Sequence, residues 1–336
     1  MKVLLYTENE KLVGKSGLGK AIKHQMKALT YANVPYTLNP KDDYDILHIN
    51  TYFPKSYLMA KRAKKKGKKI VYHAHSTEED YKNGFILSKQ TSKLFKKWLI
   101  KCYSLGDVIV TPTLYSKKLL ENYKGLENKK IYAVSNGIEL DFFKKDEKLG
   151  KKFRKDYGYK DDDKVIFGVG LYIERKGIVD FVSLAKRFPQ YKFIWFGYSP
   201  LSATTKKVRD AVNTKLDNLV FAGYVEQDII KGAMNGADLY LFPTLEETEG
   251  IPIIEACACM QNAIIRDIPI FDGWLTDGKN VYKAKDLDEF EEKIKLFFDG
   301  KLKDVTKEAY KVAKERDLKI IGKELKSIYE SLEHSN

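Results

Sequence analysis

Short runs of β-branched and aliphatic residues alternate with longer amphipathic segments along the whole chain, and no other feature constrains the fold as strongly. This pattern is typical of parallel sheets whose strands are joined by crossover helices. We therefore predict the fold class α/β. The expected strands are Val3–Tyr6, Ile46–Ile49, Ile70–His73, Val108–Thr111 and Ile131–Val134 in the first half, and Val165–Val169, Phe193–Phe196, Leu219–Phe221, Leu239–Phe242 and Ala263–Ile265 in the second.

The length of the chain, 336 residues, exceeds the size at which one hydrophobic core usually divides, so we expect two domains. The sequence SNGIELDFF at 135–143 combines a turn signal with a charged segment and is predicted to be the linker. The predicted domains are residues 1–140 and 141–316, each built on a doubly wound sheet. A helix at Leu318–Leu332, within residues 317–336, is expected to pack back across the junction. Because open α/β sheets bind ligands at the carboxyl ends of their strands, the two domains would face one central cleft.

The stretch EETEGIPIIEA, residues 246–256, places Glu247 and Glu255 eight positions apart with a Gly-Ile-Pro kink between them. Proline suits the first position of a helix, so we predict a helix at 252–260 with Glu255 in its first turn. Backbone amides at a helix start attract anions. The two carboxylates would then flank an anion-binding nest formed by Thr248, Glu249, Gly250 and Ile251. The alternative is that Glu249 and Glu255 only complement the helix dipole.

Two further stretches offer groups for a phosphate. In the second half, Arg175 and Lys176 precede a helix start at Gly177, and two cations beside helix-start amides make a phosphate pocket. A solvated charge pair that caps the helix is the alternative. In the first half, Gly17 and Gly19 open a helix and would let the backbone approach a bound group. An ordinary glycine-rich turn is the alternative there.

His75 lies in the sequence HAHS, just beyond the strand expected at 70–73. A histidine at a strand end of an α/β sheet is a site candidate. The neighbouring His73 is the second candidate, with a buried structural hydrogen bond as the alternative. No HxxxH or CxxC spacing supplies further zinc ligands, so we expect hydrogen bonding and no metal. Together these elements fit a nucleotide diphosphate sugar. The cations and amides would hold the diphosphate, Glu255 a ribose diol and Glu247 the sugar hydroxyls.

These motifs resemble family four of the retaining glycosyltransferases, which have the GT-B fold of two Rossmann-like domains facing a central cleft. The resemblance is carried by Glu247 and Glu255 as an EX7E element, the RKG loop (175–177), the NGIE linker (136–139), the SGLG loop (16–19) and HAHS (73–76). Within the family, the combination GKSGLGKAIKHQMKAL and GLYIERKG is most similar to bacterial enzymes that add the second hexose to monoglucosyl-diacylglycerol, which makes the glycolipid anchor of lipoteichoic acid. One departure is Leu171 after Gly170, where the family often has arginine, and Arg175 is expected to replace that charge.

The resemblance implies a retaining hexosyltransferase that moves galactose or glucose from a UDP-sugar to monoglucosyl-diacylglycerol. It implies no cofactor and no bound metal, because arginine, lysine and a helix end would neutralise the leaving diphosphate. The acceptor hydroxyl would attack on the front face, with the leaving phosphate as the base. The same fold acting on another acceptor, a nucleotide-sugar epimerase and a nucleic-acid-binding protein are the alternatives. The catalytic residues would be His75, Glu247, Lys176 and Arg175, and the donor-binding residues Gly17, Gly19, Arg175, Lys176, Glu247, Thr248, Glu249, Gly250, Ile251 and Glu255.

The net charge is +14, and the segment from Lys55 to Lys101 alone holds 14 lysines and arginines against three acidic residues. Such a basic segment suits nucleic acid, an anionic lipid surface or an acidic substrate, and composition alone does not choose between them. With the lipid acceptor that the resemblance implies, we expect docking on an anionic membrane, near the place where that acceptor enters. The docking residues would be Lys89, Lys93, Lys96, Lys97 and Lys101 on the outer side of a helix, opposite Leu94, Phe95, Trp98 and Cys102, with Phe85 and Ile86 as a shallow apolar anchor.

The sequence shows no signal peptide and no run of roughly 18 apolar residues. We therefore expect a cytoplasmic protein that is held peripherally at the inner face of the cell membrane. No RNA-binding module is recognisable, so nucleic acid is not expected as a partner.

Overall fold

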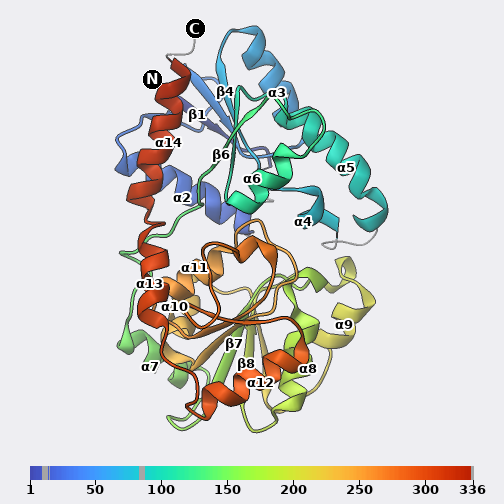
Figure 1. Cartoon of the computed structure of the whole chain (residues 1–336), viewed down its shortest axis with the longest axis vertical. Coiled ribbons are helices and arrows are strands. Elements are labelled where there is room, and N and C mark those ends of the chain that lie inside the picture. The colour runs from blue at the N-terminus through green and yellow to red at the C-terminus, as the bar shows by residue number, and fades with distance from the viewer. Residues whose placement is uncertain (10–13, 15, 83–87, 334–336) are drawn as a thin grey trace. The chain divides into compact units, whose positions relative to one another are not determined.

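The computed structural model describes residues 1–9, 14, 16–82 and 88–333, and these residues form two compact units (Figure 1). The first unit comprises Met1–Tyr81, Gln90–Glu139 and Arg316–Asn336, and the second comprises Lys82–Lys89 and Leu140–Glu315. Apart from the short segment Lys82–Lys89, the chain passes from the first unit to the second between Glu139 and Leu140, inside the segment 135–143, and returns at Arg316.

The sheet of the first unit has six parallel strands in the order β2-β1-β3-β4-β5-β6. Its strands are β1 (Val3–Tyr6), β2 (Tyr36–Thr37), β3 (Ile46–Ile49), β4 (Lys69–His73), β5 (Val108–Thr111) and β6 (Lys130–Ala133). Its helices are α2 (Gly17–Tyr31), α3 (Pro54–Lys65), α4 (Glu78–Lys82), α5 (Ser88–Tyr103), α6 (Leu114–Glu121) and α14 (Leu318–Glu333), of which α4 ends and α5 begins in the segment Lys82–Lys89 of the second unit.

The sheet of the second unit also has six parallel strands, in the order β12-β11-β10-β7-β8-β9. Its strands are β7 (Val165–Val169), β8 (Lys192–Phe196), β9 (Leu219–Gly223), β10 (Leu239–Phe242), β11 (Ala263–Arg266) and β12 (Tyr282–Ala284). Its α-helices are α7 (Glu147–Asp156), α8 (Ile178–Arg187), α9 (Lys206–Val212), α10 (Gln227–Gly236), α11 (Ile251–Ala258), α12 (Leu287–Phe298) and α13 (Thr306–Lys314), and its 3-10 helices are η1 (Glu174–Lys176), η2 (Leu201–Ala203) and η3 (Pro269–Phe271). Because β7 and β10 pair directly, the loops that follow them leave the sheet side by side.

All ten predicted strands are confirmed, and β1, β3, β5, β7 and β10 have the predicted bounds. Two strands were not predicted. They are β2 and β12, which have two and three residues and form one edge of each sheet. The α/β fold class with doubly wound parallel sheets is therefore confirmed.

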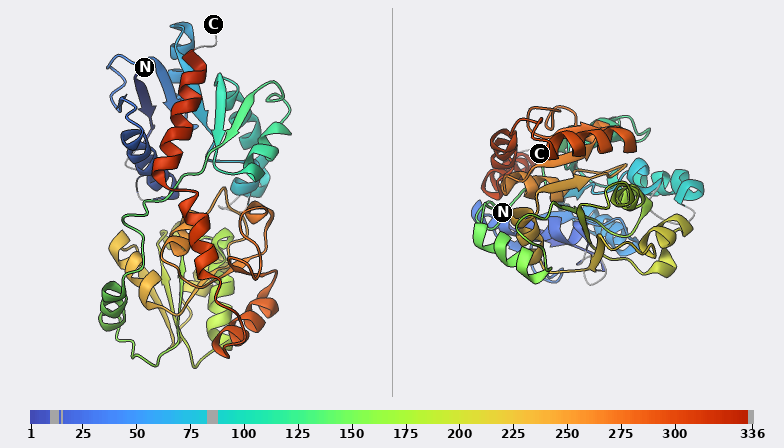
Figure 2. Two further views of the ribbon diagram at one scale, coloured as in Figure 1. Left: turned by 60° about the vertical axis from the view of Figure 1, so that its left-hand side comes forward. Right: turned by 90° about the horizontal axis from the view of Figure 1, so that it is seen from below.

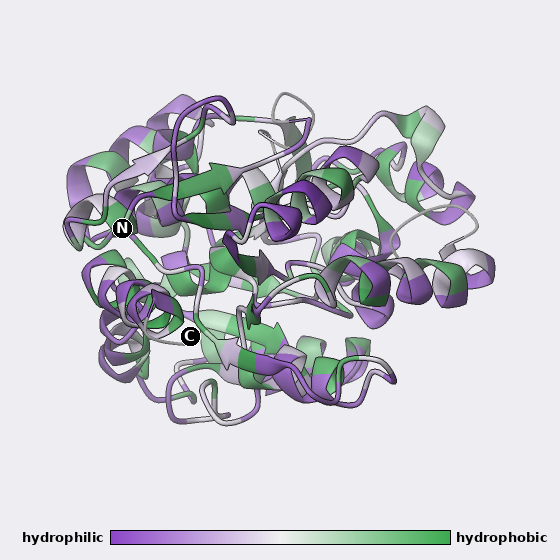
Figure 3. Ribbon diagram, turned by 90° about the horizontal axis from the view of Figure 1, so that it is seen from above, coloured by the Kyte–Doolittle hydropathy of each residue, from purple (hydrophilic) through white to green (hydrophobic). Residues whose placement is uncertain are grey.

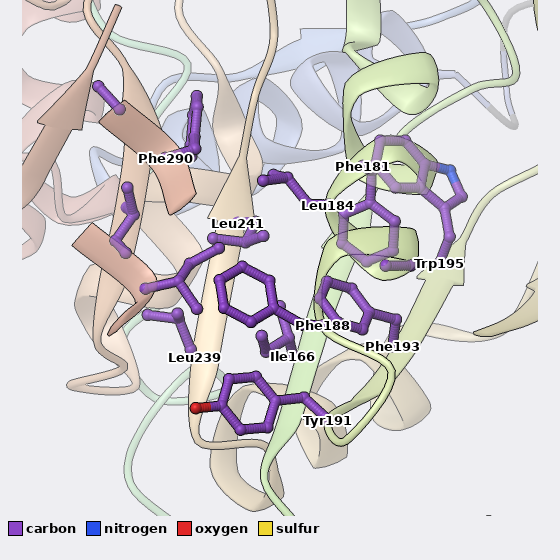
Figure 4. Close-up of a cluster of buried hydrophobic side chains, with 14 of the residues drawn as sticks. Ile166, Phe181, Leu184, Phe188, Tyr191, Phe193, Trp195, Leu239, Leu241 and Phe290 are labelled. Carbon is purple, nitrogen blue, oxygen red and sulfur yellow. The ribbon is translucent and has the colours of Figure 1, made fainter. Parts of the chain in front are cut away.

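The strands are largely hydrophobic, whereas the helices carry hydrophilic residues along part of their surface (Figure 3). This is the expected pattern for parallel sheets that are covered on both faces. In the second unit, the Phe181 ring of α8 packs edge-on against Phe193 and Trp195 of β8, with ring centroids 5.3 and 5.0 Å away (Figure 4). This aromatic core fixes the sheet from which the loops after β7 and β10 extend.

The last helix, α14, lies in the first unit, where it packs beside α2 (Figure 2). Ile321, Leu325 and Tyr329 of α14 are buried in the same core as strands β1 and β3. Contact between the two helices is close at Gly322, where an added Cβ atom would lie 2.1 Å from the Ala28 carbonyl oxygen. Among the described helices, none is long and apolar enough to cross a membrane.

Candidate functional site

The loop after β10 leads into helix α11, which begins at Ile251 and not at the predicted Pro252. Its N-cap is Gly250, whose φ of 88° and ψ of 65° lie in the left-handed region that favours glycine. The earlier start places Glu255 in the second turn, and the first turn contains no acidic residue. The prediction of Glu255 in the first turn is therefore wrong. Since the helix dipole acts within the first turn, it does not account for this carboxylate.

Three carboxyl groups of this stretch are buried: Glu247, Glu249 and Glu255 have exposed fractions of 6%, 1% and 1%. Burial of ionised groups is unfavourable unless partners surround them. The Tyr240 ring of β10 lies near two of them. Burial raises the pKa of the Tyr240 hydroxyl well above its usual value, and the charges of Glu255 and Glu247 raise it further. These carboxylates are thus enclosed in the second unit beside β10.

Glu247 is held by cations from the loop after β7. Its Oε1 atom lies 2.5 Å from Lys176 Nζ and accepts a hydrogen bond of 3.0 Å from the Thr244 hydroxyl, and its Oε2 atom lies 3.9 Å from Arg175 Nη1. Burial by itself would raise the pKa of the Glu247 carboxyl. Lys176, Arg175 and the two hydrogen bonds outweigh burial and hold that pKa below its usual range. Glu247 is therefore ionised and paired at neutral pH.

Backbone contacts join the same two loops. The Arg175 carbonyl oxygen accepts a hydrogen bond of 2.7 Å from the Leu245 amide and lies 3.1 Å from the Thr244 hydroxyl, whose one hydrogen also faces Glu247 Oε1 at 3.0 Å. Arg175 Nη1 also donates to the Glu246 carbonyl oxygen at 2.9 Å. This packing requires glycine at position 177, which has a φ of 73° and where an added Cβ atom would lie 2.2 Å from the Pro243 carbonyl oxygen.

Of the donor-site residues predicted in the second unit, Arg175, Lys176 and Glu247 are thus in direct contact. The nest predicted at Thr248, Glu249, Gly250 and Ile251 lies in the same loop, at the start of α11. Leu171, the departure from the family pattern, is half-buried two residues after β7.

The other predicted donor-site residues belong to the first unit. Gly17 and Gly19 open helix α2 as predicted, with Ser16 as the N-cap whose hydroxyl accepts from the Gly19 amide at 3.4 Å. No heavy atom of the described residues lies within 4 Å of a Cβ atom built on Gly17. The segment around Gly17 can therefore carry a side chain, and its glycine is not required by local packing.

His75 lies two residues beyond β4 and is half-buried. Its Nε2 atom lies 3.0 Å from Asn50 Oδ1, and its ring stacks on the His73 ring with centroids 3.8 Å apart. His73 is buried, with its Nδ1 atom 3.1 Å from His48 Nε2, which matches the structural alternative given for it. Sequence reasoning missed Asn50 and His48. The signal was available, because a histidine inside the buried run ILHI needs polar partners.

The predicted docking helix is α5, and its orientation differs from the prediction. Lys89, Lys93, Lys97 and Lys101 are exposed. Lys96 is not on the outer side, because its Nζ atom lies 3.2 Å from Glu78 Oε2 and 4.0 Å from the Tyr123 ring centroid.

Leu94 was predicted to face inward and is 68% exposed. The buried face of α5 is centred on Ser92, Leu99 and Cys102. Phe85 and Ile86, predicted as the apolar anchor, lie outside the described residues. Both predictions about Lys96 and Leu94 are wrong because the helix is rotated about its axis relative to the expected orientation.

Helix α3 extends the exposed lysines of α5 into one basic surface. The Tyr57 ring of α3 packs on the Trp98 ring of α5 at 5.4 Å, and Lys101 Nζ lies 5.2 Å from the Tyr57 ring centroid. Leu58 of α3 is 49% exposed. We define the α3–α5 surface as the exposed residues Leu58, Lys61, Arg62, Lys65, Lys89, Lys93, Leu94, Lys97 and Lys101.

Family models match most of the chain. Residues 23–142 match "Glycosyltransferase Family 4" and residues 150–316 match "Glycosyl transferases group 1". The chain is 37% identical to the processive diacylglycerol alpha-glucosyltransferase of Acholeplasma laidlawii, over 99% of this chain and 98% of the relative. It is 23% identical to the alpha-galactosylglucosyldiacylglycerol synthase of Streptococcus pneumoniae, over 81% of this chain and 74% of the relative.

Solved structures share the fold. Sucrose-phosphate synthase from Thermosynechococcus elongatus matches with a TM-score of 0.82 at 13% identity, covering 100% of both chains. Anabaena HepE in complex with UDP-glucose matches with a TM-score of 0.77 at 16% identity, covering 98% of this chain and 100% of the other. At these identities the likeness concerns the fold alone.

Proposed function

The chain belongs to the group 1 glycosyl transferases, with the GT-B fold, and we propose that it moves a hexose from a UDP-sugar to monoglucosyl-diacylglycerol. The observation that carries the proposal is the match over nearly the whole chain to a diacylglycerol glucosyltransferase. The second relative, a galactosylglucosyldiacylglycerol synthase, supports an acceptor that already carries one glucose.

A processive reaction is a second candidate. The relative with 37% identity is named as processive, which favours an enzyme that glucosylates diacylglycerol and then its own product. Both candidates take a UDP-hexose as the donor, and they differ in whether diacylglycerol itself is an acceptor. Formation of product from diacylglycerol alone therefore separates them.

The paired residues of the second unit have complementary roles in this proposal. Lys176 and Arg175 neutralise the diphosphate, Glu247 accepts hydrogen bonds from sugar hydroxyls, and Glu255 binds the ribose diol. The nest at Thr248–Ile251 supplies amides, and Gly17 and Gly19 of the first unit let the backbone approach the donor. The support for these roles is that two cations converge on one buried carboxylate.

The proposed reaction breaks the bond between the anomeric carbon and the phosphate oxygen and forms a bond from that carbon to the acceptor oxygen. The acceptor hydroxyl attacks from the face that the diphosphate leaves, and its proton passes to the leaving phosphate oxygen, so configuration is retained. His75 contacts the donor sugar near this centre. Lys176 and Arg175 carry the charge stabilisation, so the proposed enzyme needs no metal and no cofactor.

We propose that the α3–α5 surface holds the protein at an anionic membrane, peripherally at the inner face of the cell membrane. The exposed lysines supply attraction, each worth about 1 kcal/mol near an anionic surface. Leu58 and Leu94 are large apolar side chains exposed among these cations, and they suit shallow insertion between headgroups. A lipid acceptor would then reach the enzyme without leaving the bilayer.

A donor and acceptor screen tests the reaction. Vesicles carrying either diacylglycerol or monoglucosyl-diacylglycerol would be supplied with UDP-glucose or UDP-galactose, and NMR of the product would give the linkage. We expect one α-linked hexose to be added to monoglucosyl-diacylglycerol. Product from diacylglycerol as well would select the processive candidate. Conversion of the UDP-sugar without any lipid product would indicate an epimerase and reject both.

Vesicle sedimentation tests the membrane surface. Changing Lys93 and Lys97 to glutamate should weaken binding to anionic vesicles by about 30-fold or more, because two attractions of about 1 kcal/mol are lost. The matched control changes Lys148 and Lys151, exposed on α7 of the second unit, to glutamate and alters the net charge equally. Equal weakening by both double variants would reject a specific docking surface.

A further inference from the structure

A chain of hydrogen-bonded side chains runs through the interior of the first unit, from β4 to the last helix. His75 Nε2 lies 3.0 Å from Asn50 Oδ1, and Asn50 Nδ2 lies 2.8 Å from Gln25 Oε1. Gln25 Nε2 lies 2.8 Å from His48 Nε2, and His48 Nδ1 lies 2.7 Å from the Tyr329 hydroxyl. Four hydrogen bonds thus connect a strand-end histidine to helix α14. The interior members of this chain are buried, with His48 and Tyr329 at 0% exposure.

The chemistry of the two amides gives every bond in the chain a direction. An amide oxygen only accepts and an amide NH2 group only donates. Asn50 Oδ1 therefore accepts from His75 Nε2–H, and Asn50 Nδ2 donates to Gln25 Oε1. Gln25 Nε2 then donates to the His48 ring, whose Nε2 and Nδ1 atoms lie 2.8 and 3.2 Å away. The shorter contact favours Nε2 as the acceptor, which leaves the His48 proton on Nδ1, facing the Tyr329 oxygen. All four bonds run in one direction, from His75 to Tyr329.

His73 lies beside this chain, with its Nδ1 atom 3.1 Å from His48 Nε2. The one lone pair of that nitrogen already accepts from Gln25 Nε2, so the contact assigns no tautomer to His73. The stacking of His73 on His75, at 3.8 Å and 11° between the planes, holds the His75 ring in place from one face. The two histidines of HAHS thus have different functions, since His73 packs and His75 presents a nitrogen.

The histidines of the chain are neutral. Burial lowers the pKa of His75 to about 3 and that of His48 to about 3, where a nearby histidine charge adds to the effect. Burial also lowers the pKa of His73 well below its usual value. A neutral imidazole has one N–H group and one lone pair, so the choice of tautomer decides what His75 offers to a ligand.

We propose that this chain fixes His75 as its Nε2–H tautomer, so that Nδ1 is a hydrogen-bond acceptor for a hydroxyl of the substrate. Asn50, Gln25, His48 and Tyr329 are then positioning residues that act through His75. The identity of the hydroxyl rests on the proposed function, which supplies a sugar donor and a sugar-bearing acceptor. A phosphate oxygen cannot bind there, because it has no proton to donate to a lone pair. Nδ1 of His75 makes no hydrogen bond to the described residues, which leaves it available for a ligand.

Nitrogen-15 NMR of the histidine side chains in the full chain tests the tautomer without any substrate. We expect a pyrrole-type signal from Nε2 of His75 and a pyridine-type signal from Nδ1, with the opposite pair for His48. A protonated Nδ1 on His75 would overturn the proposal, since the chain would then run in the reverse direction. Intermediate shifts on both nitrogens would overturn it equally, because no single tautomer would be fixed.

Coupling along the chain is tested by Tyr329→Phe, which removes the last acceptor, and by Asn50→Leu, which removes the first. Both should move the His75 signals toward a mixture of tautomers. The matched control is Tyr282→Phe, which removes one hydroxyl hydrogen bond of 2.8 Å to the Lys303 carbonyl oxygen in the second unit. His75 signals that are unchanged in Tyr329→Phe would reject the role of helix α14.

Steady-state kinetics of the same variants test the coupling independently of the NMR signals. Tyr329→Phe should lower kcat by about fivefold, the effect of one neutral hydrogen bond, and should have no further effect when His75 is already leucine. An equal loss in both backgrounds would indicate a merely structural role and reject the proposal. If the proposed function is wrong, the unmodified protein will also lack hexosyl transfer, whereas the NMR result is still decisive for the tautomer.

Discussion

Replacing Lys176 with methionine removes the closest partner of a buried carboxylate and keeps a side chain of similar length. Glu247 is 6% exposed, and its Oε1 atom lies 2.5 Å from Lys176 Nζ. Removing one member of a buried ion pair usually costs about 3–5 kcal/mol, because the other charge is left in a poor solvent. Arg175 at 3.9 Å and the Thr244 hydroxyl at 3.0 Å still face Glu247 in the variant. We therefore expect the free energy of unfolding to fall by an amount at the lower end of this range, about 3 kcal/mol at pH 7.5.

The pH dependence of this loss follows from the sign of the pKa shift. In the unmodified protein the pKa of Glu247 is lowered, so its contribution to stability is present above the unfolded pKa and is lost as pH falls through the folded one. Burial is the largest influence and acts upward, so without Lys176 the folded pKa should rise above the unfolded value. The variant then loses stability as pH rises through that raised pKa, and the gap between the two proteins widens with pH.

Urea unfolding followed by tryptophan fluorescence measures the loss, because Trp195 is fully buried in the core of the second unit. The free energy of unfolding should fall by about 3 kcal/mol at pH 7.5 and by distinctly less at pH 4.5. The control is the same change in a Glu247→Gln background, where an uncharged side chain should make the loss independent of pH. Equal losses at both pH values in the parent background would refute the reasoning.

Gly177→Ala should destabilise the second unit and abolish transfer, since a Cβ atom would lie 2.2 Å from the Pro243 carbonyl oxygen. The control is Gly158→Ala, at a glycine with a φ of 70° and no atom within 4 Å of an added Cβ, which should lower the free energy of unfolding by only about 1 kcal/mol. Similar unfolding free energies for the two variants would contradict this. Glu255→Gln should raise the KM for the UDP-sugar by about tenfold with kcat nearly unchanged, because a ribose contact is lost before chemistry; a fall in kcat alone would move Glu255 to the reacting centre. Chelation with EDTA should leave the transfer rate unchanged, and loss of activity that a divalent ion restores would show that the enzyme is metal-dependent.

The sequence predicted the strands well because most of them are continuous apolar runs of four or five residues in the middle of a buried sheet. The strands β2 and β12 could not be found in this way. A strand of two residues such as Tyr36–Thr37 has no periodicity of its own, and its conformation is set by pairing with β1. The edges of the sheets were therefore determined by tertiary pairing and not by local sequence.

Helix α5 shows that the period of apolar residues alone does not predict which face of a helix is buried. Leu94 and Leu99 are equally apolar, yet one is exposed and the other fully buried. Lys96 lies at the margin of the buried face because Glu78 and the Tyr123 ring provide a charge partner and an aromatic surface there. A helical wheel assigns faces by composition, whereas the neighbours from α4 and the chain beyond α6 decide which lysine turns inward.

The candidate donor site was predictable residue by residue but not as a unit. Arg175 and Lys176 were assigned to a phosphate and Glu247 to sugar hydroxyls because each motif was read alone, and 71 positions separate Lys176 from Glu247. Their contact follows from the direct pairing of β7 with β10, which strands of similar composition cannot specify. The ion pair of Lys176 with Glu247 also changes which charges are available to the donor. In the proposed reaction the diphosphate does not meet a free lysine, because it shares Lys176 with a buried carboxylate, and the sugar hydroxyls must stabilise that carboxylate while the cation turns to the leaving group.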